Sequence, residues 1–211
     1  MNSHPPAPWT DVEMRMIHTV DVFLHKPAIM KKAQTRLENL KTALADHLQQ
    51  SPGACPPQAD IEKGQIARGE NHKGFPFLSL DLPQLFSKQC FFTFRTLFWW
   101  GHYLGFALIL KGANLEAWVE GIIRRRELNG AADLHLALHE TPWEWELEPT
   151  RLPRLNNLAA ERIREHAAAR GYIKLLRVVP VTSSRFTGLD WPDAGLTAYQ
   201  DINRLLAPSQ E

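Results

Sequence analysis

The segment from residue 68 to residue 74, RGENHKG, holds the residue types that acid–base chemistry needs. Glu70 or His72 could serve as a general base, and Lys73 could hold an anion. The segment leads directly into an apolar run, and polar loops on a rigid strand are common places for binding and catalysis. Glu70 and His72 are therefore the candidate catalytic residues. An ordinary entry loop, bounded by glycines, is the alternative interpretation.

Arg95 is a second candidate, because it interrupts the most apolar and aromatic segment of the chain, residues 90–110. If this segment forms a hairpin that turns at Gly101, Arg95 faces away from the phenylalanines and stands opposite Ala107. Small neighbours there would leave space, and a guanidinium can clamp a carboxylate or phosphate with two hydrogen bonds. The sequence thus predicts a site for a small anionic ligand, formed by Arg95, Thr93, Tyr103 and Lys73.

Two roles remain open for Arg95. In an enzyme, it would hold an anionic substrate while Glu70 or His72 moves protons. That role requires the side chains to converge on one concave site, since proton transfer needs hydrogen-bond reach. In a structural role, it would face solvent or form a buried ion pair. The candidate partners for such a pair are Asp81, Glu116 and Glu120.

Two histidines and three glutamates could suggest a metal site. A predicted hairpin of residues 133–148 places His135 and His139 opposite the glutamates between residues 144 and 148. Strand residues four apart are separated by ~13 Å, so the two histidines cannot reach one ion. One histidine with one glutamate supplies fewer ligands than a site normally needs. We therefore predict a solvated face of complementary charge and no metal.

Charge and motifs exclude several classes of function. The run Arg124-Arg125-Arg126 could bind phosphate, but it falls in the predicted last turn of a helix, where cations oppose the helix dipole. The chain has 24 basic and 23 acidic residues, so no global field favours nucleic acid or a membrane surface, and we predict neither as a partner. The glycine-rich phosphate loops and the CxxC, HExxH and GxSxG motifs are absent from the sequence. We predict no cofactor.

The fold class depends on residues 90–110, for which three structures compete. A membrane helix needs about 20 apolar residues, but an arginine near its centre costs about 2.5–3.5 kcal/mol. A single buried helix is disfavoured by the crowding of aromatic and β-branched residues. A hairpin with its loop at residues 100–102 pairs residue 99 with residue 103 and places the even-numbered phenylalanines and leucines on one face. This agreement of turn length and face favours the hairpin.

The remaining segments predict an α+β architecture, with helices packed on a mainly antiparallel sheet. A capping box between Thr10 and Glu13 begins a first helix, and Pro27 separates it from a second. The second helix carries a narrow seam of Met30, Ala33 and leucines, which could dock on the body of the protein or on a copy of itself. Further on we predict a strand from Phe75 to Leu82 that ends at Pro83, helices from Asn114 and Asn156, a strand at 172–181 and a final helix at 196–206.

Length and composition predict one cytoplasmic protein with a substantial core. We divide the 211 residues into a helical segment (1–50), a Pro/Gly linker (51–58) and an α+β domain (59–211) that packs with the helices as one unit. Cys55 and Cys90 give no disulfide framework. The first residues, MNSHPPAPW, lack the charged start and apolar stretch of a signal peptide.

Two stretches, ENHKGFPFLSLDLP and RTLFWWGH, resemble a family of bacterial proteins to which no activity has been assigned. The resemblance covers residues 69–112, roughly a fifth of the chain. It implies a place in the bacterial cytoplasm and brings no site residues with it.

The missing catalytic motifs favour a binding protein over an enzyme. We expect a protein that binds a small ligand or a partner chain, with self-association as a homodimer through the seam of the second helix. The alternative is a hydrolase or transferase that acts on an anionic small molecule, using Arg95 with Glu70 or His72. A membrane-associated protein is the third possibility, and it predicts insolubility without detergent.

Overall fold

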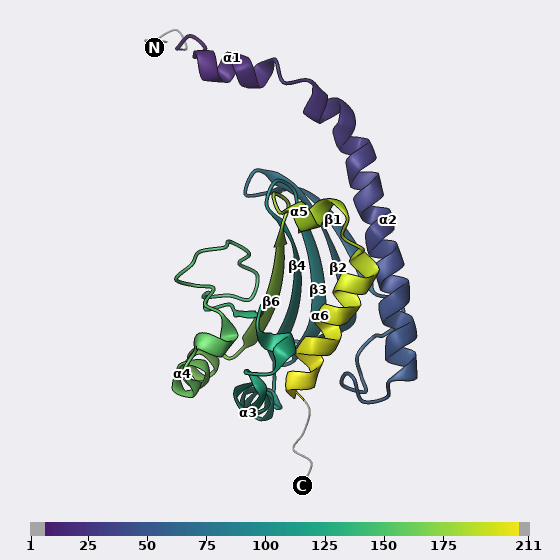
Figure 1. The fold of residues 1–211 in the computed structure, drawn as a ribbon, viewed down its shortest axis with the longest axis vertical. Helices are drawn as coiled ribbons and strands as arrows, with labels where there is room; N and C mark the ends of the chain where they lie inside the picture. Colours follow the sequence, from purple (N-terminus) through teal and green to yellow (C-terminus); the bar gives the residue numbers. More distant parts are fainter. Residues whose placement is uncertain (1–6, 207–211) are drawn as a thin grey trace.

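The computed structural model describes residues 7–206, which form a six-stranded antiparallel sheet with a layer of helices (Figure 1). The order across the sheet is β1-β2-β3-β4-β6-β5, which confirms the predicted α+β fold. Residues 1–6 and 207–211, at the two ends of the expected segments, lie outside the described residues. The strands are β1 (Gln65–His72), β2 (Phe75–Phe86), β3 (Phe91–Trp99), β4 (Tyr103–Lys111), β5 (His135–Leu136) and β6 (Ile173–Pro180).

The aromatic segment forms the predicted hairpin. β3 and β4 pair with Trp99 opposite Tyr103 and Arg95 opposite Ala107, and Gly101 in the turn has a φ of 76°. A positive φ is easily adopted by glycine, which explains its place in the loop. Within residues 7–206, no helix combines the length and apolar composition needed to cross a membrane.

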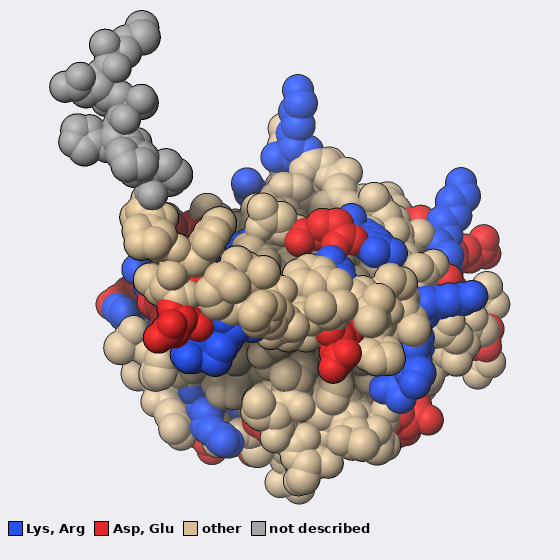
Figure 2. Space-filling view, turned by 90° about the horizontal axis from the view of Figure 1, so that it is seen from above, with Lys and Arg blue, Asp and Glu red and all other residues tan. Residues whose placement is uncertain are grey.

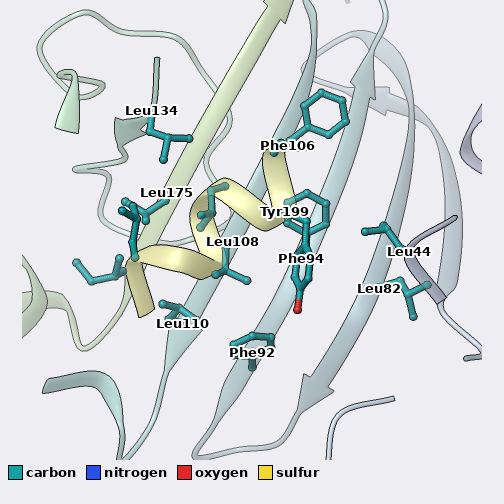
Figure 3. Close-up of a cluster of buried hydrophobic side chains, with 14 of the residues drawn as sticks. Leu44, Leu82, Phe92, Phe94, Phe106, Leu108, Leu110, Leu134, Leu175 and Tyr199 are labelled. Atoms are coloured by element: carbon teal, nitrogen blue, oxygen red, sulfur yellow. The ribbon is translucent and has the colours of Figure 1, made fainter. Parts of the chain in front are cut away.

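The helices cover one face of the sheet and bury its even-numbered apolar side chains (Figure 3). Phe92 and Phe94 of β3 and Phe106 of β4 belong to this core, and the ring of Tyr199 meets that of Phe94 edge-on at 5.2 Å. Burial of apolar surface of this kind is the main favourable contribution to folding. The helices are α1 (Asp11–Ile17), α2 (Asp21–Gln50), α3 (Leu115–Arg125), α4 (Ala160–Arg170), α5 (Ser184–Thr187) and α6 (Trp191–Leu206).

The predicted seam of α2 packs on the body of the protein. This is the first of the two alternatives predicted from the sequence, the other being packing on a second copy of the chain. α2 packs against α6 and β2. Gly195 allows the close approach of α6, because a Cβ at this position would lie 2.6 Å from the side chain of Leu40. The buried residues of α2 are Met30, Ala33, Leu37, Leu40, Leu44 and Leu48.

The break between the two N-terminal helices lies earlier than predicted. α1 begins with the predicted capping box, in which Thr10 and Glu13 satisfy each other's backbone N–H groups. It ends at Ile17, and α2 then runs from Asp21 through Pro27 without interruption. Pro27 lies near the start of α2, where its missing N–H removes one hydrogen bond without ending the helix.

The predicted hairpin of residues 133–148 is wrong. Two of its residues form β5, which pairs with β6 instead, and residues 137–153 follow as an irregular segment that we call the strap. Leu136 packs under the helices whereas Trp145 packs on the opposite face of the sheet, so they cannot share one face of a hairpin. His139 is buried rather than solvated. Across residues 7–206, no three His, Cys, Asp or Glu side chains are placed to hold a metal ion.

Other boundaries differ by a few residues. β1 includes most of the polar segment expected to be a loop, and as an edge strand its polar side chains protect the sheet from further pairing. β2 continues past Pro83, because the strand register shifts between Asp81 and Gln84 and so accommodates the missing N–H. α4 begins at Ala160, after Asn156 has been taken into a short 3₁₀ turn.

Candidate functional site

Arg95 forms a buried ion pair on the second face of the sheet, which the strap covers. Its Nε and Nη2 donate to the two carboxylate oxygens of Asp81 at 2.8 and 2.7 Å, and the Thr93 hydroxyl donates to the same carboxylate at 3.0 Å. The register places Asp81 directly opposite Arg95, and its side chain is 3% exposed. Removing Arg95 would leave the buried carboxylate of Asp81 without its charge partner, so the pair is part of the architecture.

The space expected beside Arg95 is filled by aromatic side chains. Trp143 and Trp145 of the strap lie over the guanidinium, with ring centroids 5.0 and 6.0 Å from its Cζ. These distances are typical of cation–π contacts. The ring of Tyr103 occupies the space beside Gly105, where a Cβ would lie 2.7 Å from it. The small residues that suggested a ligand site therefore accommodate the protein's own rings.

Lys174 anchors the strap to the sheet. Its buried ammonium donates to the backbone carbonyls of Pro142 and Glu144 at 3.1 and 2.6 Å, and it lies 3.3 Å from the ring centroid of Trp145. Burial lowers the pKa of Lys174 well below its ordinary value, and nearby Arg95 adds to this effect. Two of its N–H donors are thus used by backbone carbonyls of the strap, and the face of Trp145 covers the same nitrogen. Two hydroxyls complete the anchoring, that of Tyr103 on the Trp145 carbonyl and that of Tyr172 on the His139 carbonyl.

Glu70 and Lys73 are engaged in ion pairs near the edge of the sheet. Lys26 of α2 and Arg68 donate to the carboxylate of Glu70 at 2.6 and 2.9 Å and hold its pKa below its ordinary value. A carboxylate stabilised in this way is a weaker base. Lys73 pairs with Glu146 of the strap, which raises the pKa of the lysine. Both charges thus have partners within the chain.

His72 lies at the end of the sheet that holds the β1–β2 and β3–β4 turns, which we call the turn end, away from Arg95. Its ring centroid is 4.9 Å from that of Trp99, and burial lowers the pKa of its imidazole. Trp99 is four residues from Arg95 along β3, a separation of ~13 Å. The structure therefore brings Arg95 and Thr93 together at Asp81, and it does not bring either of them to His72 or Glu70. The acid–base arrangement of the enzyme hypothesis is not assembled at this face.

A recess at the turn end of the sheet contains one of the predicted binding residues. It has a volume of about 420 Å³ and is lined by Lys73, Trp99, His102, Glu146 and Leu147. Lys73 pairs with Glu146, and His102 stacks on Trp99 with 3.7 Å between ring centroids. The charged groups of the recess therefore satisfy each other.

The largest group of exposed apolar side chains lies in the N-terminal arm, residues 9–29, which comprises α1 and the first turns of α2. α1 and the start of α2 project beyond the sheet (Figure 1), and near the end of the arm Lys26 contacts Glu70 of β1. It carries nine of the fourteen large apolar residues that are exposed within residues 7–206, each between 42% and 71% exposed. Large apolar patches of this kind mark interaction surfaces. The nine are Trp9, Val12, Met16, Ile17, Val20, Val22, Phe23, Leu24 and Ile29.

Comparison with protein-family models, with curated proteins and with solved structures found no match to this chain. Reasoning from sequence missed the arm, because an apolar stripe does not indicate whether the body of the protein covers it. It also missed Lys174, although a lysine inside the apolar strand 172–181 was a visible signal that its charge must have dedicated partners.

Proposed function

We propose that this chain is a protein-interaction module that self-associates through its N-terminal arm. The observation that carries the proposal is the exposure of the nine large apolar side chains of residues 9–29. α1 buries none of its residues, and the first buried residue of α2 is Met30. A helix with an apolar face that its own body does not cover is suited to pack against another surface.

The exposed area of the arm is large enough for a stable dimer. Each of the nine side chains presents on the order of 100 Å². The arm thus offers about 900 Å², whereas the largest apolar patch of a typical monomer covers about 300–600 Å². A standard interface buries about 800 Å² on each partner. A second copy of the arm supplies an apolar surface of matching size.

The charges of the arm fit an antiparallel arrangement of two copies. Asp11 and Glu13 stand near its N-terminal end, and the exposed Lys31 and Lys32 follow its C-terminal end. A two-fold axis near residue 21 brings the acidic end of one arm to the basic end of the other. Opposite charges at the rim of an interface favour one orientation over its reverse.

The same charges favour a protein partner over a lipid surface. Helices that lie on membranes are rich in Lys and Arg on their polar face. Residues 9–29 instead carry Asp11, Glu13 and Asp21 against Arg15 and Lys26. Basic and acidic side chains are also interspersed over the end of the molecule from which the arm projects (Figure 2). A single-sign field of the kind that attracts anionic lipid is not a feature of this surface.

Sedimentation velocity over a concentration series tests the proposal. We expect the wild-type protein to sediment as a dimer that dissociates on dilution. The double variant Phe23→Glu/Leu24→Glu should remain monomeric, because it places charges in an apolar interface that offers them no partners. Leu128→Glu is the matched control, since Leu128 is an exposed apolar residue outside the arm and its replacement should leave the dimer intact.

A wild-type protein that is monomeric at every concentration would overturn the proposal. If that monomer floats with phosphatidylcholine vesicles and the double variant does not, the arm belongs to a membrane surface instead. Circular dichroism of both variants checks that the fold is retained, which is expected because both sets of positions are exposed.

A further inference from the structure

A pocket of about 800 Å³ lies at the end of the helical layer, far along α2 from the arm. It is an open pocket lined by the C-terminal ends of α2 and α6, the start of α3 and the linker of residues 51–58. The volume falls within the range of about 300–1,000 Å³ that is usual for small-molecule sites. None of the side chains predicted from sequence to form a site lines it.

The linker wall of this pocket is held in place. The hydroxyl of Tyr199 in α6 donates to the carbonyl of Ala54 at 2.6 Å, and the Ala54 N–H donates to the carbonyl of Ser51 at 3.1 Å. The ring of His47 packs edge-on against that of Tyr199, with 6.1 Å between centroids. Burial raises the pKa of the neighbouring Cys55 thiol, which therefore stays protonated. The pocket is thus largely formed before a ligand arrives.

Carboxamides are the most numerous polar groups in the lining of the pocket, which also includes His47, Ser51 and Arg204. Gln58, Asn114, Gln200 and Asn203 come from the linker, α3 and α6, and none of these side chains hydrogen-bonds to another residue within 7–206. The described lining contains no Asp or Glu, and its one arginine, Arg204, pairs with Asp201 at 3.1 Å. Each carboxamide offers an acceptor and two donors side by side.

An aromatic wall stands among these amides. Trp118 of α3 lines the pocket and is half-buried, and its ring centroid lies 5.9 Å from that of Phe92 beneath it. Indole faces accept planar rings by stacking, with little dependence on the identity of the ring. The pairing of a stacking surface with donor and acceptor groups is the combination that recognises a nitrogen heterocycle.

We propose that this pocket binds a small molecule that carries a planar, purine-type nitrogen heterocycle. The ring would lie against Trp118, and its edge of adjacent donors and acceptors would pair with the carboxamides of Gln200 and Asn203. Carboxamides bind the edge of adenine in this bidentate way. A carboxylate or phosphate is not required, because Arg204 already has Asp201 as its partner.

Isothermal titration calorimetry with adenosine tests the inference, and 2-naphthalenemethanol serves as an aromatic probe without ring nitrogens. We expect adenosine to bind at one site and the naphthalene to bind at least tenfold more weakly. Asn203→Ala and Trp118→Leu should each weaken adenosine binding about tenfold or more. Gln50→Ala, at the same end of α2 but outside the pocket, should leave it unchanged.

Three outcomes would overturn the inference: no adenosine binding at millimolar concentration, equal binding of the naphthalene, or unchanged binding to Asn203→Ala. Asn203 is partly exposed and makes no side-chain hydrogen bond with the described residues, so its replacement should not unfold the protein. The arm variant Phe23→Glu/Leu24→Glu should bind adenosine as the wild type does. Failure of self-association and failure of this inference are therefore separate results.

Discussion

The buried part of α2 and the arm that precedes it carry the same kind of apolar stripe but differ in what covers it. From Met30 to Leu48, the seam is buried against α6 and β2. Toward the N-terminus, the stripe continues at Val20, Phe23 and Pro27 with the same three- and four-residue spacing, and there the residues are exposed. Periodicity therefore encodes an apolar face, and the surroundings decide whether that face stabilises the monomer or remains available to a partner.

The largest effect on stability should come from the buried part. Leu40→Ala removes a fully buried side chain at the contact with α6. We expect the free energy of unfolding to fall by about 2–5 kcal/mol, because lost burial and a residual cavity both contribute. Urea denaturation measured by circular dichroism checks this value. A loss below about 1 kcal/mol would mean that the seam is no better covered than the arm.

Overpacking the same contact should have the next largest effect. Gly195→Val places a branched side chain where a single Cβ would already lie 2.6 Å from Leu40 and 3.1 Å from Phe106. Forcing side chains into a packed core costs about 1–3 kcal/mol. The matched control is Gly188→Val, since a Cβ at Gly188 meets nothing within 4 Å. Thermal unfolding of the two variants should separate them, and equal melting temperatures would contradict the close packing of α2 on α6.

The capping box of α1 should stabilise α1 itself without contributing to the stability of the whole protein. Thr10→Ala removes the hydroxyl that accepts the Glu13 N–H, and such a loss costs about 1 kcal/mol of helix stability. Because α1 buries none of its residues, we expect α1 to fray while the global unfolding transition stays where it is. Backbone NMR shifts report the fraying. A shift of the global transition would place α1 in the cooperative core.

The smallest effect on the monomer should come from the arm itself. Leu24→Ala truncates a side chain that is 68% exposed, so the free energy of unfolding at a dilute, monomeric concentration should change by less than about 0.5 kcal/mol. The same variant should weaken self-association, because there its side chain is buried between copies. Denaturation at low and high protein concentration separates the two effects. A large fall in the free energy of unfolding of the dilute sample would contradict the proposed difference between the arm and the buried part of α2.

The parts of the fold that could be predicted are those in which several local sequence signals indicate the same structure. The β3–β4 hairpin was predictable because turn length, glycine position and side-chain alternation gave one answer, and Trp99 pairs with Tyr103 as expected. The strap was not predictable from alternation. Its leucines and tryptophans alternate like strand residues, yet the backbone carbonyls of the strap are bound by Lys174 and by tyrosines that are distant in sequence.

The candidate site shows the same limit. Asp81 was among the partners predicted for Arg95, because both residues lie on apolar strands that could be neighbours. The contact of Trp143 with Arg95 could not be predicted from the sequence, since it depends on the path of the strap. The carboxamide pocket was also invisible, because the linker, α3 and α6 that line it meet through tertiary packing alone.

Hydrogen–deuterium exchange of the wild-type protein at a low and a high concentration tests the central claim most directly. We predict that amides of residues 11–29 exchange more slowly at the high concentration, and that Phe23→Glu/Leu24→Glu abolishes this difference. Amides of residues 30–48 should exchange alike in all samples, because the body of the protein already covers them. Arm amides that exchange equally fast at both concentrations would contradict self-association through the arm.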